Sequence, residues 1–182
     1  MIIDIKKIKK EMLYPILLQA VSASILVSVL ISKTVPTMNF PSRIIIERIL
    51  GIGNQFDSYT ILCEVFIKIS IFVFIQFIFL SLLFKVFAEI LCKNDVPFLD
   101  TALIICKPAL ISALLLICGV PWLFITPAAV IPYIFASFII TLLYNYTATC
   151  STLNINMNKG ILLTTSVYLI YFTFIWICIM KA

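Results

Sequence analysis

The sequence predicts an all-α fold: a polytopic membrane protein of one domain, residues 1–182, built as a bundle of five transmembrane helices with a short interfacial helix in the first loop. Composition is the first reason, because 63% of the residues are hydrophobic and 12% are charged. Soluble domains are about half apolar and about a quarter charged. The second reason is that apolar runs such as 69–84 are continuous, whereas barrel strands alternate apolar and polar residues. The third is their length, because a helix needs about 20 apolar residues to cross a bilayer.

The first expected span, 13–31, follows a segment with lysines at positions 6, 7, 9 and 10. No A-x-A cleavage site follows this span and further spans come later, so we interpret it as a retained signal-anchor helix. Ala20, Ser24 and Ser28 repeat every four residues and share one helix face, which permits close helix packing. That face either packs within the chain or forms the seam of a homo-oligomer.

The loop after the first span contains the segment 41–50, PSRIIIERIL. Ser42 is placed to cap a short helix, and Arg43 and Glu47 stand four residues apart, a spacing that supports a helix. The segment is too short to cross a bilayer and too apolar for water. We therefore expect an interfacial helix that lies on the membrane surface.

The second expected span is 66–87, and lysines stand near both of its ends. Lys68 and Lys85 can keep their stems in the hydrocarbon while their charges reach the interface. Glu64 precedes Lys68 by four residues, so we expect these two side chains to pair.

Residues 108–144 contain no charge. A single helix of that length would measure about 55 Å, nearly twice the hydrocarbon thickness, so the run has to fold back on itself. We place the reversal at Gly119-Val120-Pro121, because glycine permits a turn and proline stops a helix. This predicts a third span at 101–119 and a fourth at 123–144.

Two features of these spans bear on transport. Pro127 and Pro132 lie inside the fourth span, and we expect them to kink it; broken helices often line transport sites. Lys107 lies inside the third span, where a charge is a functional hypothesis. Lys107 either contacts a lipid headgroup or an ion, or snorkels to the interface from two turns inside its helix.

The fifth expected span, 161–180, is rich in aromatic residues. We expect Tyr168, near its middle, to pack against a neighbouring helix. The later aromatic residues, Tyr171, Phe172, Phe174 and Trp176, fit the aromatic belt at a membrane interface.

The basic residues favour a cytoplasmic N-terminus and an outside C-terminus in the plasma membrane. With that orientation, the inside holds Lys6, Lys7, Lys9, Lys10, Lys85, Lys93, Lys107 and Lys159. The outside holds Lys33, Arg43, Arg48, Lys68 and Lys181. An excess of Lys and Arg marks the cytoplasmic side, and the first helix usually dominates.

The residue types needed for catalysis are scarce. The chain has no histidine, and no acidic residue lies deep in an expected span, so a paired-carboxylate site is disfavoured. The six cysteines form no C-x-x-C pair and are expected to be free thiols. We therefore expect no enzyme, and no catalytic, cofactor-binding or metal-binding residues. Nucleic acid is not an expected partner, because the basic residues flank apolar runs.

The order of these features resembles the Yip domain family of small five-span membrane proteins, in a bacterial-type member. A basic flank leads to one span, then to a long loop with an amphipathic piece, and then to a second span and a short charged linker. Pro97-Phe98 and Lys107-Pro108-Ala109 belong to the third span and its approach, and Lys159-Gly160 precedes the fifth. The resemblance covers nearly the whole chain and implies a five-span membrane protein. It assigns a role to no individual residue.

The absent catalytic set and the small-residue faces favour a non-enzymatic integral membrane scaffold or accessory protein. Its expected partners are membrane lipids, and a membrane protein partner or a second copy of the chain. One alternative is a permease component or a carrier for a small solute, for which we expect a polar cavity near Pro127, Pro132 and Lys107. Another alternative is an immunity-type protein against a membrane-active peptide, a function that nothing in the sequence supports or excludes.

Overall fold

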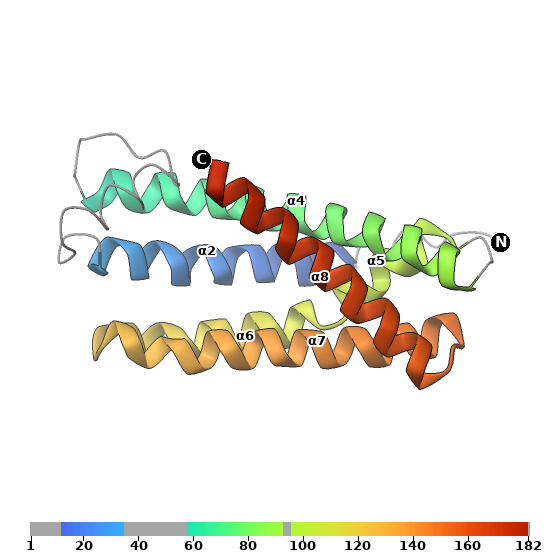
Figure 1. The fold of residues 1–182 in the computed structure, drawn as a ribbon. Coiled ribbons are helices and arrows are strands. Elements are labelled where there is room, and N and C mark those ends of the chain that lie inside the picture. Colours follow the sequence, from blue (N-terminus) through green and yellow to red (C-terminus); the bar gives the residue numbers. More distant parts are fainter. Residues whose placement is uncertain (1–11, 35–57, 93–95, 182) are drawn as a thin grey trace.

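The structure, a computed structural model, describes residues 12–34, 58–92 and 96–181 (Figure 1). Its helices are α2 (Tyr14–Thr34), α4 (Ser58–Cys92), α5 (Phe98–Cys106), α6 (Ala109–Gly119), η3 (Val120–Phe124), η4 (Pro127–Val130), α7 (Ile131–Leu153) and α8 (Met157–Lys181), where η marks a 3-10 helix. Among these residues, five helical segments are long and apolar enough to cross a membrane, so the predicted all-α bundle of five transmembrane helices is confirmed. The interfacial helix predicted at 41–50 lies outside the described residues.

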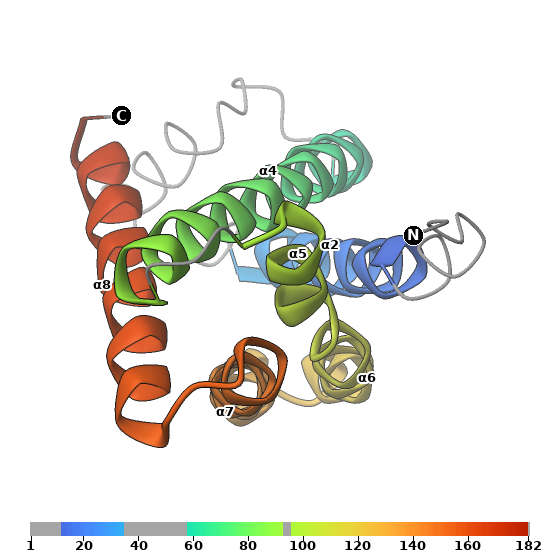
Figure 2. The same cartoon turned by 90° about the vertical axis from the view of Figure 1, so that its right-hand side faces the viewer.

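The five spanning segments are arranged as a closed ring. α2 contacts α4 and α6, α6 contacts α7, α7 contacts α8, and α8 returns to α4. In Figure 1, α8 crosses the bundle obliquely, in front of the other helices, and Figure 2 looks along the bundle into the ring. Side chains from five helices therefore face a common interior.

Close packing within this ring uses the small-residue stripe of α2. Ala20, Ser24 and Ser28 are all buried within the chain, and Ser24 Oγ lies 2.8 Å from Ser70 Oγ of α4. Small side chains let helices approach closely, and the hydroxyl pair gives each polar group a partner away from water. Packing within the chain is thus confirmed, and this stripe is not available as the seam of a homo-oligomer.

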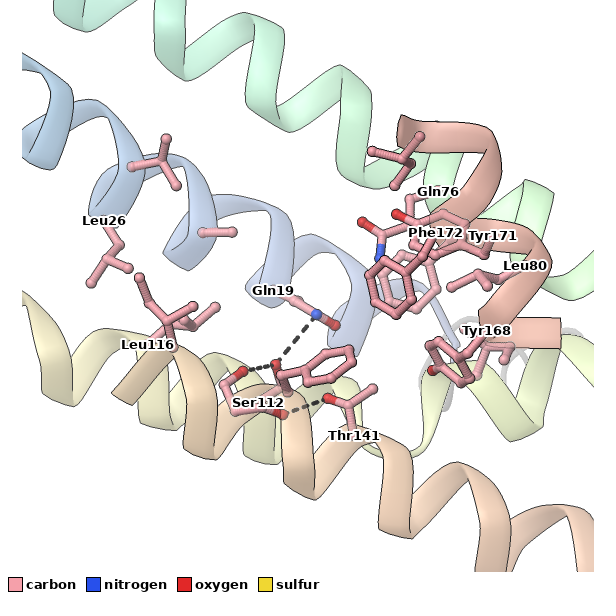
Figure 3. Close-up of a pocket in the computed structure, with 18 residues that line it drawn as sticks. Gln19, Leu26, Gln76, Leu80, Ser112, Leu116, Thr141, Tyr168, Tyr171 and Phe172 are labelled. Atoms are coloured by element: carbon pink, nitrogen blue, oxygen red, sulfur yellow. Dashed lines mark hydrogen bonds between the residues drawn. The ribbon is translucent and has the colours of Figure 1, made fainter. Parts of the chain in front are cut away.

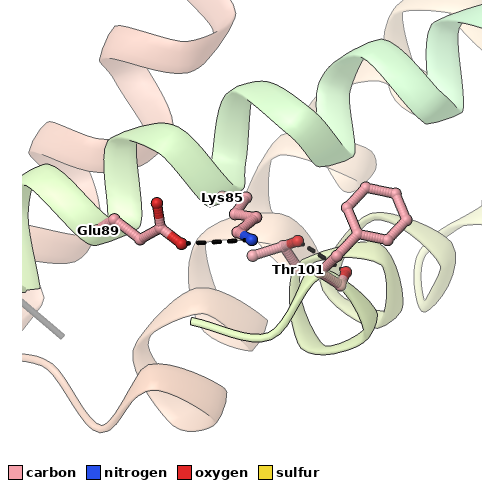
Figure 4. A network of polar contacts seen from close by, with 4 residues as sticks. Lys85, Glu89 and Thr101 are labelled. Atoms are coloured by element: carbon pink, nitrogen blue, oxygen red, sulfur yellow. Dashed lines mark hydrogen bonds and ion pairs between the residues drawn. The ribbon is translucent and has the colours of Figure 1, made fainter. Parts of the chain in front are cut away.

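α4 is longer than a bilayer core requires, and an ion pair stands near each end of its apolar part. Lys68 Nζ lies 3.7 Å from Glu64 Oε2, as predicted, and Lys85 Nζ lies 3.5 Å from Glu89 Oε1 (Figure 4). The uncharged run between them, 69–84, extends over about 24 Å at the helical rise. Because lysine stems also lie in hydrocarbon, this run matches a core of about 30 Å, and α4 projects beyond it at both ends.

α5 lies across one end of the ring and is separated from α6 by a break at Lys107-Pro108. It contacts α4 and α7, and Figure 2 shows it at the near end of the bundle. The break follows from proline, which has no N–H and whose ring crowds the preceding turn. The third span predicted at 101–119 is therefore not one continuous helix, and α5, with Ile104 and Ile105 buried, closes the end of the ring.

The chain reverses between η3 and η4, and not at Gly119. Gly119 has helical dihedral angles (φ −72°, ψ −27°), whereas Thr126 is extended (φ −148°, ψ 136°). A Cβ on Gly119 would lie 3.2 Å from Leu26 Cδ1 and 3.2 Å from Tyr133 Cβ. The glycine is thus needed for close packing and not for a turn. The reversal predicted at 119–121 is wrong, and the third span continues through η3.

Pro127 and Pro132 begin helices and kink none. Pro127 stands in the first turn of η4 and Pro132 in the first turn of α7, where the missing N–H leaves no bond unmade. α7 then runs unbroken to Leu153 and ends at Asn154, whose left-handed conformation (φ 50°) is a common helix stop. The kink predicted for 123–144 is wrong, and the fourth span is Pro127–Leu153.

Candidate functional site in the ring interior

A cavity of about 290 Å³ lies inside the helix ring. Its walls come from α2, α4, α6, α7 and α8, and Ile105 of α5 adds to the lining. Figure 3 shows α2 between α4 on one side and α6 and α7 on the other, with side chains from all of them turned inward. The volume is close to the lower limit for small-molecule sites, so we take this cavity as the candidate functional site.

A chain of hydrogen bonds lines one wall and joins three helices. Gln19 Nε2 of α2 donates to Ser112 Oγ of α6 over 3.3 Å. Ser112 Oγ lies 2.6 Å from Ser137 Oγ of α7, and either hydroxyl can donate. Thr141 Oγ1 donates to the Ser137 carbonyl oxygen over 2.8 Å (Figure 3). Such bonds hold spanning helices together where lipid offers no polar partner.

Gln76 of α4 brings a second amide to the cavity. It stands midway between Lys68 and Lys85 in the sequence, so its depth is near the middle of the hydrocarbon. Gln76 lines the cavity, and within the described residues its amide makes no hydrogen bond. Gln76 is half-buried, and an amide without a hydrogen-bond partner inside the hydrocarbon is unfavourable. Water or a ligand in the cavity would offset that cost.

The side-chain amides of Gln19 and Gln76 are the main evidence that this cavity is a functional site. Gln19 and Gln76 are the only asparagine or glutamine residues in the five spans expected from the sequence. They come from different helices, 57 positions apart in the sequence, and both line the same cavity. Polar side chains inside spanning helices turn toward the bundle interior and often mark a functional path.

The opposite wall is aromatic. The Tyr168 ring lies 6.3 Å from that of Phe84 on α4 and 6.4 Å from that of Phe138 on α7, edge-on in both cases. Asn145 Nδ2 of α7 donates a hydrogen bond to the Tyr168 hydroxyl. The prediction that Tyr168 packs against a neighbouring helix is confirmed. Edge-to-face ring pairs add to the energy of apolar burial.

No lining residue carries a charge. An ion inside the cavity would lose its hydration without meeting an opposite charge, which is strongly unfavourable. The lining therefore favours neutral molecules. In the part of the chain that the structure describes, no three His, Cys, Asp or Glu side chains stand close enough to hold a metal ion. The absence of cofactors and metals stays a prediction.

The residues singled out for transport lie elsewhere. Lys107 is exposed at the break between α5 and α6, and Pro127 and Pro132 are exposed at the starts of their helices. None of the three lines this cavity, so the polar cavity expected near them is not this one and stays a prediction. Ser112 and Ser137 could not be found from the sequence, because serine is common in spanning helices. The two amides could have been found from their rarity there.

No protein-family model, no curated protein and no solved structure matches the chain.

Proposed function

We propose that the chain is a non-enzymatic integral membrane protein that binds a small uncharged amphiphile in the cavity of its helix ring and carries it within the membrane. This is the carrier among the functions expected from the sequence. The observation that supports it best is that Gln19 and Gln76, the two amides of the expected spans, line one cavity of about 290 Å³.

The chemistry of the lining defines the ligand. A charged molecule finds no counter-charge there, and a purely apolar one would leave the Gln76 amide without a partner. A molecule with a carbonyl or hydroxyl group and a hydrocarbon body can hydrogen-bond to the polar wall and pack against the aromatic wall. The serine chain and Gln76 would bind its polar end, and the rings around Tyr168 would pack against its apolar part.

The charges at the ends of the bundle support the orientation that we propose, with the N-terminus in the cytoplasm and the C-terminus outside the plasma membrane. Among the described residues, Lys85, Lys107 and Lys159 belong to the end where α2 begins, and Lys33, Lys68 and Lys181 to the opposite end. The lysine-rich segment that precedes α2 adds to the first group. Positive charge gathers on the cytoplasmic side.

The test is equilibrium binding of a neutral probe in a bilayer. The full chain is placed in lipid nanodiscs, and fluorine NMR follows a dodecanol that carries a terminal trifluoromethyl group. We expect a signal for bound probe that is distinct from the signal of probe in lipid. Gln76→Leu should weaken binding about tenfold, as loss of about one hydrogen bond does, and Ala23→Phe should abolish binding by filling the cavity.

Matched variants separate the cavity from general effects on the helices. Ile75 and Val21 are exposed on α4 and α2 and do not line the cavity. Ile75→Leu and Val21→Phe should therefore bind the probe like the unchanged protein. Equal binding by Gln76→Leu and Ile75→Leu would contradict the proposal, as would binding that survives Ala23→Phe.

The other functions stay predictions. The scaffold function loses one of the observations that favoured it, because the small-residue stripe is buried within the chain. The immunity-type function gains no support from any described residue. The resemblance to the Yip domain family stays a resemblance of layout.

A further inference from the structure

A second concavity lies on the outer side of the contact between α7 and α8. This groove has a volume of about 550 Å³. Leu143 of α7 and Leu169 of α8 line it and are 58% and 64% exposed. Both helices are long and apolar enough to span the membrane, so the groove faces the hydrocarbon of the bilayer.

The groove and the cavity share a wall. Tyr168 and Phe172 line both, and their ring centres are 6.2 Å apart. Two side chains of α8 thus form a boundary that the cavity and the groove share.

Buried polar groups lie next to this wall, within helices that span the membrane. The Tyr168 hydroxyl accepts a hydrogen bond from Asn145, but Asn145 Oδ1 and Thr164 Oγ1 are buried and have no hydrogen-bond partner within the described residues. Thr164 lines the groove. An orphaned buried acceptor or donor is unfavourable, so a passing hydroxyl group would be stabilised at this point.

Buried apolar side chains lie at both ends of the ring. At one end α5 contacts α4 and α7, with Ile104 and Ile105 buried. At the other end a buried cluster is formed by Leu26, Leu116, Leu123 and Val130. A ligand that comes from water meets these apolar side chains, whereas a ligand dissolved in the bilayer already lies beside the groove.

We propose that the uncharged amphiphile reaches the cavity sideways from the bilayer, through the groove between α7 and α8, and that the Tyr168–Phe172 wall is the gate. The proposal rests on the function proposed above. Its occupant is the same neutral molecule, whose hydroxyl or carbonyl group pairs with the Thr164 hydroxyl in the groove. Displacement of the Tyr168 ring opens the wall, and the Asn145 hydrogen bond holds it shut.

The experiment measures how fast the probe exchanges between lipid and cavity. In nanodiscs with the full chain, exchange fluorine NMR of the trifluoromethyl dodecanol gives the exchange rate and the bound fraction together. Thr165 is exposed and lines only the groove, so Thr165→Trp obstructs the groove and leaves the cavity intact. We expect exchange to slow about tenfold or more while the bound fraction stays the same.

Leu162 provides the matched control. It stands one turn away on α8, is 54% exposed and lines neither the groove nor the cavity, so Leu162→Trp should leave both quantities unchanged. Asn145→Leu removes the bond that holds Tyr168 and should speed exchange.

The outcomes separate the two proposals. If the unchanged protein shows no bound probe, the proposed function fails. If it binds the probe but Thr165→Trp and Leu162→Trp exchange at the same rate, the lateral route is wrong and the proposed function stands. A bound fraction that falls in Thr165→Trp alone would also overturn the route, because the groove would then be part of the binding site itself.

Discussion

The ammonium nitrogen of Lys33 lies 3.2 Å from the carbonyl oxygen of Leu123 and donates a hydrogen bond to it. The same nitrogen stands 4.1 Å from the centre of the Phe124 ring. Lys33 is in the last turn of α2, and Leu123 is near the end of η3. Because carbonyl groups at a helix end have no partner inside the helix, a cation there is favourable. One side chain therefore fixes the point where the third span ends.

Replacing Lys33 by methionine should destabilise the protein by about 1 kcal/mol, because the hydrogen bond and the cation–π contact are both lost while the apolar stem remains. Thermal unfolding in detergent measures the change. Lys107→Met is the control, since Lys107 is exposed and outside the cavity; it should alter neither stability nor probe binding. Equal losses in the two variants would contradict the assigned contact.

The serine pair between α6 and α7 should behave as one unit. Ser112→Ala leaves the Ser137 hydroxyl and the Gln19 amide short of a partner, and Ser137→Ala has a similar effect, at about 1–3 kcal/mol each. The double variant should cost clearly less than the sum, which a double-mutant cycle of unfolding free energies detects. Strict additivity would mean that the two hydroxyls do not interact. Ser151→Ala, at an exposed serine of α7, should change little.

Gly160 permits the close approach of α8 to α7. A Cβ at this position would collide with Cys150 Sγ and lie 3.3 Å from Tyr146 Cε2. Gly160→Ala should therefore destabilise the protein by about 1–3 kcal/mol, the usual effect of overpacking. Adding Cys150→Ala removes the colliding sulfur and should recover most of the loss. Unfolding curves of the two variants decide this, and no recovery would show that the strain lies elsewhere.

The orientation is testable with reporters fused to the C-terminus. An odd number of spans and a cytoplasmic N-terminus put the C-terminus outside. A reporter that works only in the cytoplasm should be silent there, and one that works only outside should be active. The reverse pattern in intact cells would invert the assignment of both faces.

The five spans were predictable because they depend on a local quantity, the length of an uncharged apolar run compared with the bilayer. The course of the chain between the third and fourth spans was not. Gly119 has the sequence appearance of a turn, but its role is to let Leu26 and Tyr133 approach closely, a requirement set by other helices. In the sequence, Pro127 and Pro132 likewise look like kinks inside a helix. Because the chain reverses just before Pro127, both residues instead stand in the first turns of helices.

The candidate site depends still more on tertiary arrangement. Gln19 and Gln76 are visible as rare amides in apolar runs, yet nothing local indicates that they line the same cavity. That follows from the order of contacts around the ring, in which α2 lies between α4 and α6. The serines of α6 and α7 join the site for the same reason.

The ring also has a consequence for biogenesis. Its circuit is completed only by the contacts of α8 with α4 and α7, and α8 is made after the other helices of the ring. Until it is inserted, the nascent protein presents the Gln76 amide to lipid acyl chains, and a product truncated after α7 retains that defect. The amide that we propose as a ligand-binding group in the finished protein thus marks an unfinished copy for cellular quality control.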